Sequence, residues 1–285
     1  MRMFLSAAIL ALLGAAPAAP VRFDYDARTP LAVHEESASE KDGAQVRELT
    51  YAKLAGGRTG ATLVTPRSAG RHPAILFVHW YDSDATNSNR TQFLDEAVGL
   101  ARAGAVSLLI DTMWSDTKWF GQRNPAEDFP NSVAQVKELR RALDVLAARP
   151  EVDPKRLAYV GHDFGAMYGS LLGSDKRASA YVLIAGTKSF SDWYLFGRKL
   201  QGEARDAVVR ELAPLDPSVH AAELAPSPVL FQFGTQDPYV PAAAADAFFA
   251  GARDPKEMRR YDCGHEMNAA ASADRVAWLK AKLGL

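Results

Sequence analysis

The sequence predicts an α/β fold built on a doubly wound, mostly parallel sheet. Strand-like and helix-like segments alternate along almost the whole chain, which is the pattern of a parallel sheet covered by helices on both faces. Several strand-like segments are unbroken apolar runs, as expected of strands that are buried on both sides. Reactive side chains follow three of these strands, and sheets of this kind bind their ligands beyond the carboxyl ends of the strands.

The expected elements follow from the periodicity of apolar residues. Residues 21–45 are polar and predict an irregular lead-in. We expect strands at residues 45–54, 60–66, 74–79, 106–110, 157–160, 180–185, 229–233 and 258–261. We expect helices at residues 93–101, 132–148, 165–173, 208–212, 242–250 and 271–283. Two aromatic-rich excursions, at 112–131 and 187–227, separate these elements, and long loops in compact domains usually serve function.

The first eighteen residues have the pattern of a secretory signal peptide. A basic start at Arg2 precedes an apolar run over residues 4–13, and Ala16-Pro17-Ala18 supplies an Ala-x-Ala cleavage site. The apolar run is too short to cross a bilayer. We therefore expect cleavage after Ala18, a secreted or periplasmic protein, and a single domain over residues 19–285.

Charge and composition narrow the class of partner. The 33 Lys and Arg residues balance 34 Asp and Glu residues, so the chain lacks the basic excess that is typical of nucleic-acid binding, and we expect no stable membrane anchor. The single cysteine, Cys263, excludes an internal disulfide. No group of residues has metal-ligand spacing, so we expect no metal and no cofactor, and a small molecule is the expected substrate.

One short stretch carries the strongest functional signal. Gly161-His162-Asp163-Phe164-Gly165 follows the strand expected at 157–160 and precedes a helix. A Gly-x-Asp-x-Gly turn in this context is typical of a nucleophile elbow, in which the middle residue stands on a strained turn. The glycines are needed because a side chain there would collide with the neighbouring strand and helix. Alternatively, Asp163 only caps the following helix, since Asp is a favoured N-cap residue.

Two later loops carry partners for Asp163. The strand expected at 229–233 is followed by Asp237, within a Gly-x-x-Asp-x-x-x-Pro loop, and the strand expected at 258–261 is followed by His265. Nucleophile, acid and histidine thus come in the order of a hydrolase triad. Because a simple helix cap predicts neither partner, we interpret Asp163, Asp237 and His265 as the candidate catalytic residues.

This arrangement resembles the α/β-hydrolase superfamily over nearly the whole mature sequence. The resemblance implies an α/β-hydrolase fold with the insert at about 187–227 as a short lid, and the general layout is similar to that of dienelactone hydrolases. Matched to the His-Gly stretch of the family, His79 implies an oxyanion hole formed by the backbone N–H groups of Tyr81 and Phe164. We expect the side chain of His79 to bond to nearby backbone rather than to take part in the chemistry.

An aspartate at the elbow implies its own chemistry. No Gly-x-Ser-x-Gly or Gly-x-Cys-x-Gly occurs in the chain. A carboxylate attacks without a general base because it is already ionised, and we expect the helix N-terminus to favour that form. Attack on an sp3 carbon gives an alkyl-enzyme ester, which water activated by His265 and Asp237 can hydrolyse. The elbow resembles those of haloalkane dehalogenases, which carry tryptophan where Phe164 stands, and epoxide hydrolases, whose lid tyrosines are matched here by Tyr194 alone.

Three interpretations remain open at this point. The protein is a secreted hydrolase that uses Asp163 covalently, an ester or lactone hydrolase in which Asp163 acts as a base or holds water, or a non-catalytic binding protein on the same fold. Aromatic side chains from the loops are expected to wall a pocket for a small apolar or aromatic substrate. The candidates are Trp80, Trp114, Trp119, Trp193 and Tyr194.

Overall fold

The computed structural model describes residues 21–285, so the signal peptide predicted at 1–18 lies outside the described residues. Nine strands form a single sheet. The strands are β1 (His34–Lys41), β2 (Ala44–Ala52), β3 (Arg58–Thr65), β4 (His72–Val78), β5 (Val106–Ile110), β6 (Val152–His162), β7 (Ala178–Ile184), β8 (Val229–Gly234) and β9 (Lys256–Tyr261).

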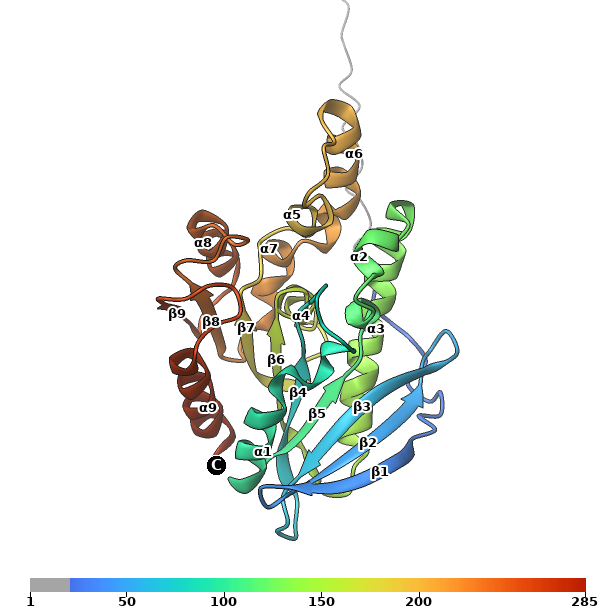
Figure 1. Cartoon of the computed structure of the whole chain (residues 1–285), viewed down its shortest axis with the longest axis vertical. Helices are drawn as coiled ribbons and strands as arrows, with labels where there is room; N and C mark the ends of the chain where they lie inside the picture. The colour runs from blue at the N-terminus through green and yellow to red at the C-terminus, as the bar shows by residue number, and fades with distance from the viewer. Residues whose placement is uncertain (1–20) are drawn as a thin grey trace, which may run out of the picture.

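The sheet is mostly parallel, with the strand order β1-β2-β3-β5-β4-β6-β7-β8-β9 (Figure 1). From β5 to β9 along this order every neighbouring pair is parallel, whereas β1, β2 and β3 add an antiparallel extension at one side. The predicted doubly wound α/β architecture is therefore confirmed. In parallel strands the carboxyl ends meet at the same edge, and this edge carries the candidate site.

Strand β1 corrects the expectation of an irregular lead-in. Residues 34–41 form a strand that pairs antiparallel with β2 at the edge of the sheet. Its residues are exposed on both faces except for the half-buried Lys41. A strand with both faces in water needs no alternation of apolar and polar residues, so its sequence carries no period to detect.

Nine α-helices accompany the sheet in residues 21–285. They are α1 (Leu94–Arg102), α2 (Trp119–Gln122), α3 (Asp128–Ala147), α4 (Phe164–Ser170), α5 (Phe190–Tyr194), α6 (Gly202–Leu212), α7 (Pro217–His220), α8 (Ala242–Gly251) and α9 (Ala269–Leu283). Helix α3 begins four residues before the expected start at Ser132, because Pro130 lies in its first turn, where proline removes no intrahelical hydrogen bond. None of the described helices is both long and apolar enough to span a membrane.

Two apolar layers cover the sheet. Side chains of α3, α4 and α8 pack with one face, and side chains of α1 and α9 pack with the other. The insert at 187–227 lies between β7 and β8 and contains α5, α6 and α7. In Figure 1, α6 rises away from the sheet at the top of the molecule. The site lies beneath the start of this insert, at the carboxyl ends of β4, β6, β8 and β9.

Candidate active site

The turn after β6 has the geometry of a nucleophile elbow. Asp163 has φ of 57° and ψ of −116°, a conformation that is strained for a residue with a side chain. A Cβ atom at Gly161 would lie 2.3 Å from the carbonyl oxygen of Gly165, and one at Gly165 would lie 2.5 Å from the carbonyl oxygen of Val78. Both glycines are thus required by the close approach of α4 to β6 and β4, as predicted.

Asp163 does not act as a helix cap. It occupies the N-cap position of α4, but its side chain makes no capping hydrogen bond. Its Oδ2 instead accepts a hydrogen bond of 3.1 Å from the backbone N–H of Tyr81, which follows β4. Its Oδ1 is shielded from water and has no hydrogen-bond partner in the described part of the chain. The interpretation of Asp163 as only an N-cap is therefore wrong.

The acid and the histidine come from the two neighbouring strand ends. His265 follows β9, and its Nδ1 lies 2.8 Å from Oδ2 of Asp237, which follows β8. The other oxygen of Asp237 accepts backbone N–H bonds from Tyr239 at 2.8 Å and Val240 at 3.0 Å. Because the Asp237 side chain is completely buried, these bonds hold it in one orientation. The imidazole therefore donates Nδ1–H to Asp237 and keeps Nε2 for the cavity.

Burial dominates the protonation of Asp163. It raises the pKa of this carboxyl to about 7, although His265 and the Tyr81 N–H both favour the ionised form. The expectation that the helix N-terminus favours an ionised Asp163 leaves out burial, which opposes it more strongly. Helix α4 is only seven residues long, and Asp163 is 3% exposed. Burial lowers the pKa of His265, but its hydrogen bond to Asp237 and the charge of Asp163 outweigh this, and the net pKa is raised.

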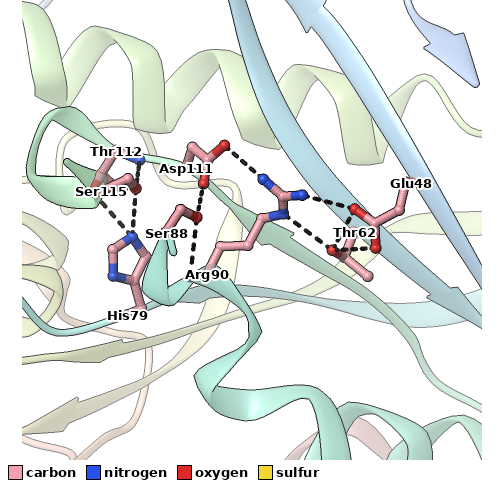
Figure 2. A network of polar contacts seen from close by, with 8 residues as sticks. All are labelled: Glu48, Thr62, His79, Ser88, Arg90, Asp111, Thr112 and Ser115. Atoms are coloured by element: carbon pink, nitrogen blue, oxygen red, sulfur yellow. Dashed lines mark hydrogen bonds and ion pairs between the residues drawn. The ribbon is translucent and has the colours of Figure 1, made fainter. Parts of the chain in front are cut away.

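The side chain of His79 has the structural role expected from the sequence. Its Nδ1 donates to the carbonyl oxygen of Trp80 at 2.6 Å. Its Nε2 accepts from the hydroxyl of Ser115 at 2.8 Å, as Figure 2 shows. Burial lowers the His79 pKa to about 4, so the ring is neutral. The C=O and N–H of a trans peptide point in opposite directions, so His79 directs the N–H of Tyr81 toward Asp163. The matching role of the Phe164 N–H in an oxyanion hole stays a prediction.

A second network of polar side chains fixes the loop between β4 and α1. Arg90 binds Oδ2 of Asp111 at 2.7 Å and Oε2 of Glu48 at 2.8 Å, and Ser88 donates to the other oxygen of Asp111. Figure 2 shows this cluster reaching from the end of β5 to the hydroxyl of Thr62 on β3. It fixes the start of the segment that leads into α1, which follows Trp80 and Tyr81 in the chain.

A cavity of about 570 Å³ opens above Asp163 and His265. Of the five predicted pocket residues, Trp80 and Trp193 line it. The segments 112–131 and 187–200 each supply part of its wall, as predicted. Other lining residues were not predicted as pocket residues. They are Asp82, Ser83, Asp84, Phe120, Phe196, Gly197, Tyr239 and Glu266.

The remaining three predicted pocket residues form a support behind Phe164. The Trp114 side chain is 1% exposed and donates Nε1–H to the carbonyl of His79 at 3.0 Å. The Trp119 ring packs edge-on against Phe164, with 5.4 Å between centroids. The hydroxyl of Tyr194 is buried and lies 3.1 Å from Ser132 Oγ and 2.7 Å from the Tyr168 hydroxyl. Their assignment to the pocket wall is wrong, because aromatic loop residues pack as well around a core ring as around a cavity.

Within residues 21–285, no group of three or more His, Cys, Asp or Glu side chains is placed to hold a metal ion.

Known proteins share this architecture. No family model matches the chain. The chain is 28% identical over 124 residues to polyketide transferase ATR5 of Stachybotrys chlorohalonatus, a match that covers 43% of this chain and 39% of that protein. It is 27% identical over 169 residues to the alpha/beta hydrolase domain-containing protein WAV2 of Arabidopsis thaliana, covering 54% of each.

The solved structures extend the likeness to nearly the whole chain. The acetyl xylan esterase from Paenibacillus sp. R4 superposes with a TM-score of 0.73 at 19% identity, covering 88% of this chain and 89% of that one. A superposition of this extent at this identity shows a shared fold. The chain has the α/β-hydrolase fold.

Proposed function

We propose that the protein is a hydrolase in which Asp163 displaces a leaving group from an sp3 carbon. The observation that carries this proposal is the hydrogen bond from the Tyr81 N–H to Oδ2 of Asp163, with Oδ1 left without a partner in the described residues. A substrate carbonyl cannot use that amide while Asp163 occupies it. In the covalent route the oxyanion is the oxygen of Asp163 itself, so the donor already stands where charge develops.

In the first step, Oδ1 of ionised Asp163 forms a bond to the substrate carbon. The bond from that carbon to the leaving group breaks, and its electron pair departs with the leaving group. Trp193 lines the cavity, and its Nε1–H is buried without a partner in residues 21–285. We assign this N–H to the departing anion, because a buried donor without a partner gains a hydrogen bond there.

A leaving group that departs as a stable anion, such as halide, fits this site better than an epoxide oxygen. An epoxide oxygen needs a proton donor as the ring opens. Tyr194 cannot supply it, because its hydroxyl is engaged with Tyr168 and Ser132 behind Phe164. A neutral indole N–H stabilises an anion without transferring a proton.

In the second step, His265 activates water. Its Nε2 takes a proton from the water as the oxygen attacks Cγ of the ester, and the negative charge that develops on Oδ2 faces the Tyr81 N–H. The Cγ–Oδ1 bond then breaks, and the product alcohol leaves with Oδ1 and with the proton from His265. Asp237 stabilises the imidazolium that forms between these events, as expected of a carboxylate bonded to Nδ1.

Trapping the ester tests this route. His265→Gln should allow attack and stall release, so incubation with 1-haloalkanes should raise the intact mass by the alkyl fragment. Peptide mapping should assign the increase to residues 161–165, and His265→Gln combined with Asp163→Asn should show none. Normal turnover by His265→Gln without any accumulated adduct would contradict the proposal.

Ester hydrolysis is the second candidate function. It is favoured by the acetyl xylan esterase that superposes over nearly the whole chain. In that reaction Asp163 would act as a base or hold the attacking water. Turnover of p-nitrophenyl acetate that leaves no adduct on Asp163 and survives in Asp163→Asn at a tenth or more of the wild-type rate would favour this candidate. The intact His265–Asp237 hydrogen bond argues for catalysis over simple binding.

A further inference from the structure

His162 is a buried histidine for which the mechanism above has no use. It precedes Asp163, is 1% exposed, and has a hydrogen bond on each ring nitrogen. Its Nδ1 lies 2.6 Å from the amide nitrogen of Gln92, and its Nε2 lies 2.9 Å from the backbone carbonyl of His265. Gln92 in turn accepts the backbone N–H of Trp80 at 3.0 Å. The side chains of Gln92 and His162 thus connect the segments at the ends of β4, β6 and β9.

In this series of hydrogen bonds, the direction of each bond determines the direction of the next. The Trp80 N–H can only donate, so it must face the oxygen of the Gln92 amide, and the amide nitrogen is turned toward His162. Because that nitrogen donates, Nδ1 of His162 must accept, and the ring proton belongs on Nε2. Nε2–H then donates to the carbonyl of His265. We call this series of hydrogen bonds from Trp80 through Gln92 and His162 to His265 the relay. It requires a neutral His162, and burial together with the nearby His265 holds the His162 pKa well below its ordinary value.

The aromatic ring of Trp80 ties the same loops together. It stacks on His162 at 5.1 Å and 16°, and on His265 at 5.5 Å and 20°. The rings of His162 and His265 lie 5.2 Å apart. The Trp80 ring therefore packs against His265 and holds it, while the backbone N–H of Trp80 is bound by Gln92. The next residue along the chain, Tyr81, supplies the N–H that binds Asp163.

We propose that Gln92 and His162 are positioning residues that set His265 at a fixed distance from the Tyr81 N–H. The two groups act on the same ester in the second step, one by delivering hydroxide to Cγ and the other by binding Oδ2. They lie on loops after β9 and β4 and are far apart in sequence, and the relay joins them across the elbow. This role rests on the proposed function of His265 as the base that activates water.

Nitrogen-15 NMR of the histidine rings tests the relay without a substrate. In the wild-type protein His162 should show a single neutral tautomer with the proton on Nε2, unchanged between pH 6 and 9. In Gln92→Met, which keeps the length of the side chain but removes both polar atoms, Nδ1 loses its donor. The proton should stay on Nε2, because the carbonyl of His265 can only accept, and the Nδ1 resonance should shift toward that of a ring nitrogen without a hydrogen bond. A wild-type His162 that carries its proton on Nδ1, or that titrates in this range, would overturn the proposal even if the covalent route holds.

Kinetics test the consequence for catalysis. Gln92→Met should lower kcat about 10- to 100-fold with KM changed less than about threefold, because a small misplacement of a catalytic group costs rate rather than binding. Gln92→Asn, which is polar but too short to reach both partners, should behave like Gln92→Met. The matched control is Gln135→Met, since Gln135 also accepts one backbone N–H, from Met113 at 2.8 Å.

The control separates positioning from general destabilisation. Gln135→Met should lose stability comparably while keeping kcat within about threefold of the wild-type value. Equal losses of kcat in Gln92→Met and Gln135→Met, or full activity in Gln92→Asn, would refute the positioning role. Because the nitrogen spectra involve no turnover, failure of the relay and failure of the covalent mechanism give different results.

Discussion

Two carboxylates occupy equivalent places in the sheet but have opposite surroundings. Asp111 directly follows β5, Asp163 directly follows β6, and these strands flank β4 on its two sides. Asp111 is bound by the guanidinium of Arg90 and by the hydroxyl of Ser88. Asp163 receives one backbone N–H on one oxygen and nothing on the other in the described residues.

The difference separates a structural carboxylate from a reactive one. A nearby cation stabilises a charged carboxylate, and the pair holds the loops that carry it in place. Asp163 lies on a strained backbone at φ of 57°, and burial raises its pKa to about 7. Strain and desolvation of this kind concentrate at sites where a group must react rather than stabilise.

The sharpest test of this contrast is the effect of Asp163→Asn on stability. The pKa of Asp163 is 3.8 ordinarily and about 7 in the folded protein, so folding is disfavoured once the group ionises, by up to about 4 kcal/mol at 1.36 kcal/mol per pKa unit. The substitution Asp163→Asn removes this cost. The amide nitrogen that it introduces has no hydrogen-bond partner at this position among the described residues, and its burial offsets part of the gain in stability. We expect Asp163→Asn to unfold in urea with a free energy about 2 kcal/mol higher than the wild type at pH 8.

The pH dependence supplies the control for that measurement. Because the folded-state pKa is raised, the wild type loses stability as pH rises from about 4 to about 7, and the cost is complete above pH 7. The advantage of Asp163→Asn should therefore shrink as the pH is lowered toward 4. An advantage that is equal at pH 5 and pH 8 would show that ionisation of Asp163 is not its source.

The opposite effect is expected at the paired carboxylate. Asp111→Asn weakens the contacts with Arg90 and Ser88, in a cluster where the Asp111 and Arg90 side chains are about one quarter exposed. We expect a loss of about 1–2 kcal/mol in the free energy of unfolding, measured at pH 8 under the same conditions. A stabilising Asp111→Asn would remove the distinction between the two carboxylates.

The pH profile of activity should report the same ionisation. Attack needs Asp163 charged, and its pKa of about 7 predicts that kcat/KM falls about tenfold for each unit of pH below 7. Protonation of His265 in acid slows the hydrolytic step and therefore lowers kcat as well. Initial rates between pH 5 and 8.5, with folding monitored at each pH, check this. A flat profile below pH 7 in folded protein would contradict a buried, reactive Asp163.

The fold and the candidate triad could be predicted from the sequence because they depend on local patterns. Apolar runs mark buried strands, and a parallel sheet brings the loops after successive strands to one edge. Asp163, Asp237 and His265 each follow such a run, so their meeting needs only the strand order. Strand β1 was missed because it is exposed on both faces and has no apolar period.

The pocket wall and the charge of Asp163 could not be predicted in the same way. Whether Trp119 faces the cavity or Phe164 depends on packing between segments that are far apart in the sequence, and no local pattern records it. The helix N-terminus favours an ionised Asp163, but the desolvation that opposes it comes from the whole assembled site. The signal for Gln92 was weaker still, since one polar residue in a loop predicts no partner.

The central claim is that Oδ1 of Asp163 bonds to the substrate and leaves in the product. A single turnover in water enriched in oxygen-18, with enzyme in excess over a 1-haloalkane, tests it most directly. The account predicts a product alcohol that carries ordinary oxygen from the enzyme, and one labelled oxygen in the peptide that contains Asp163. A first-turnover product that carries oxygen-18, with an unlabelled Asp163, would mean that water attacks the substrate directly and would contradict the account.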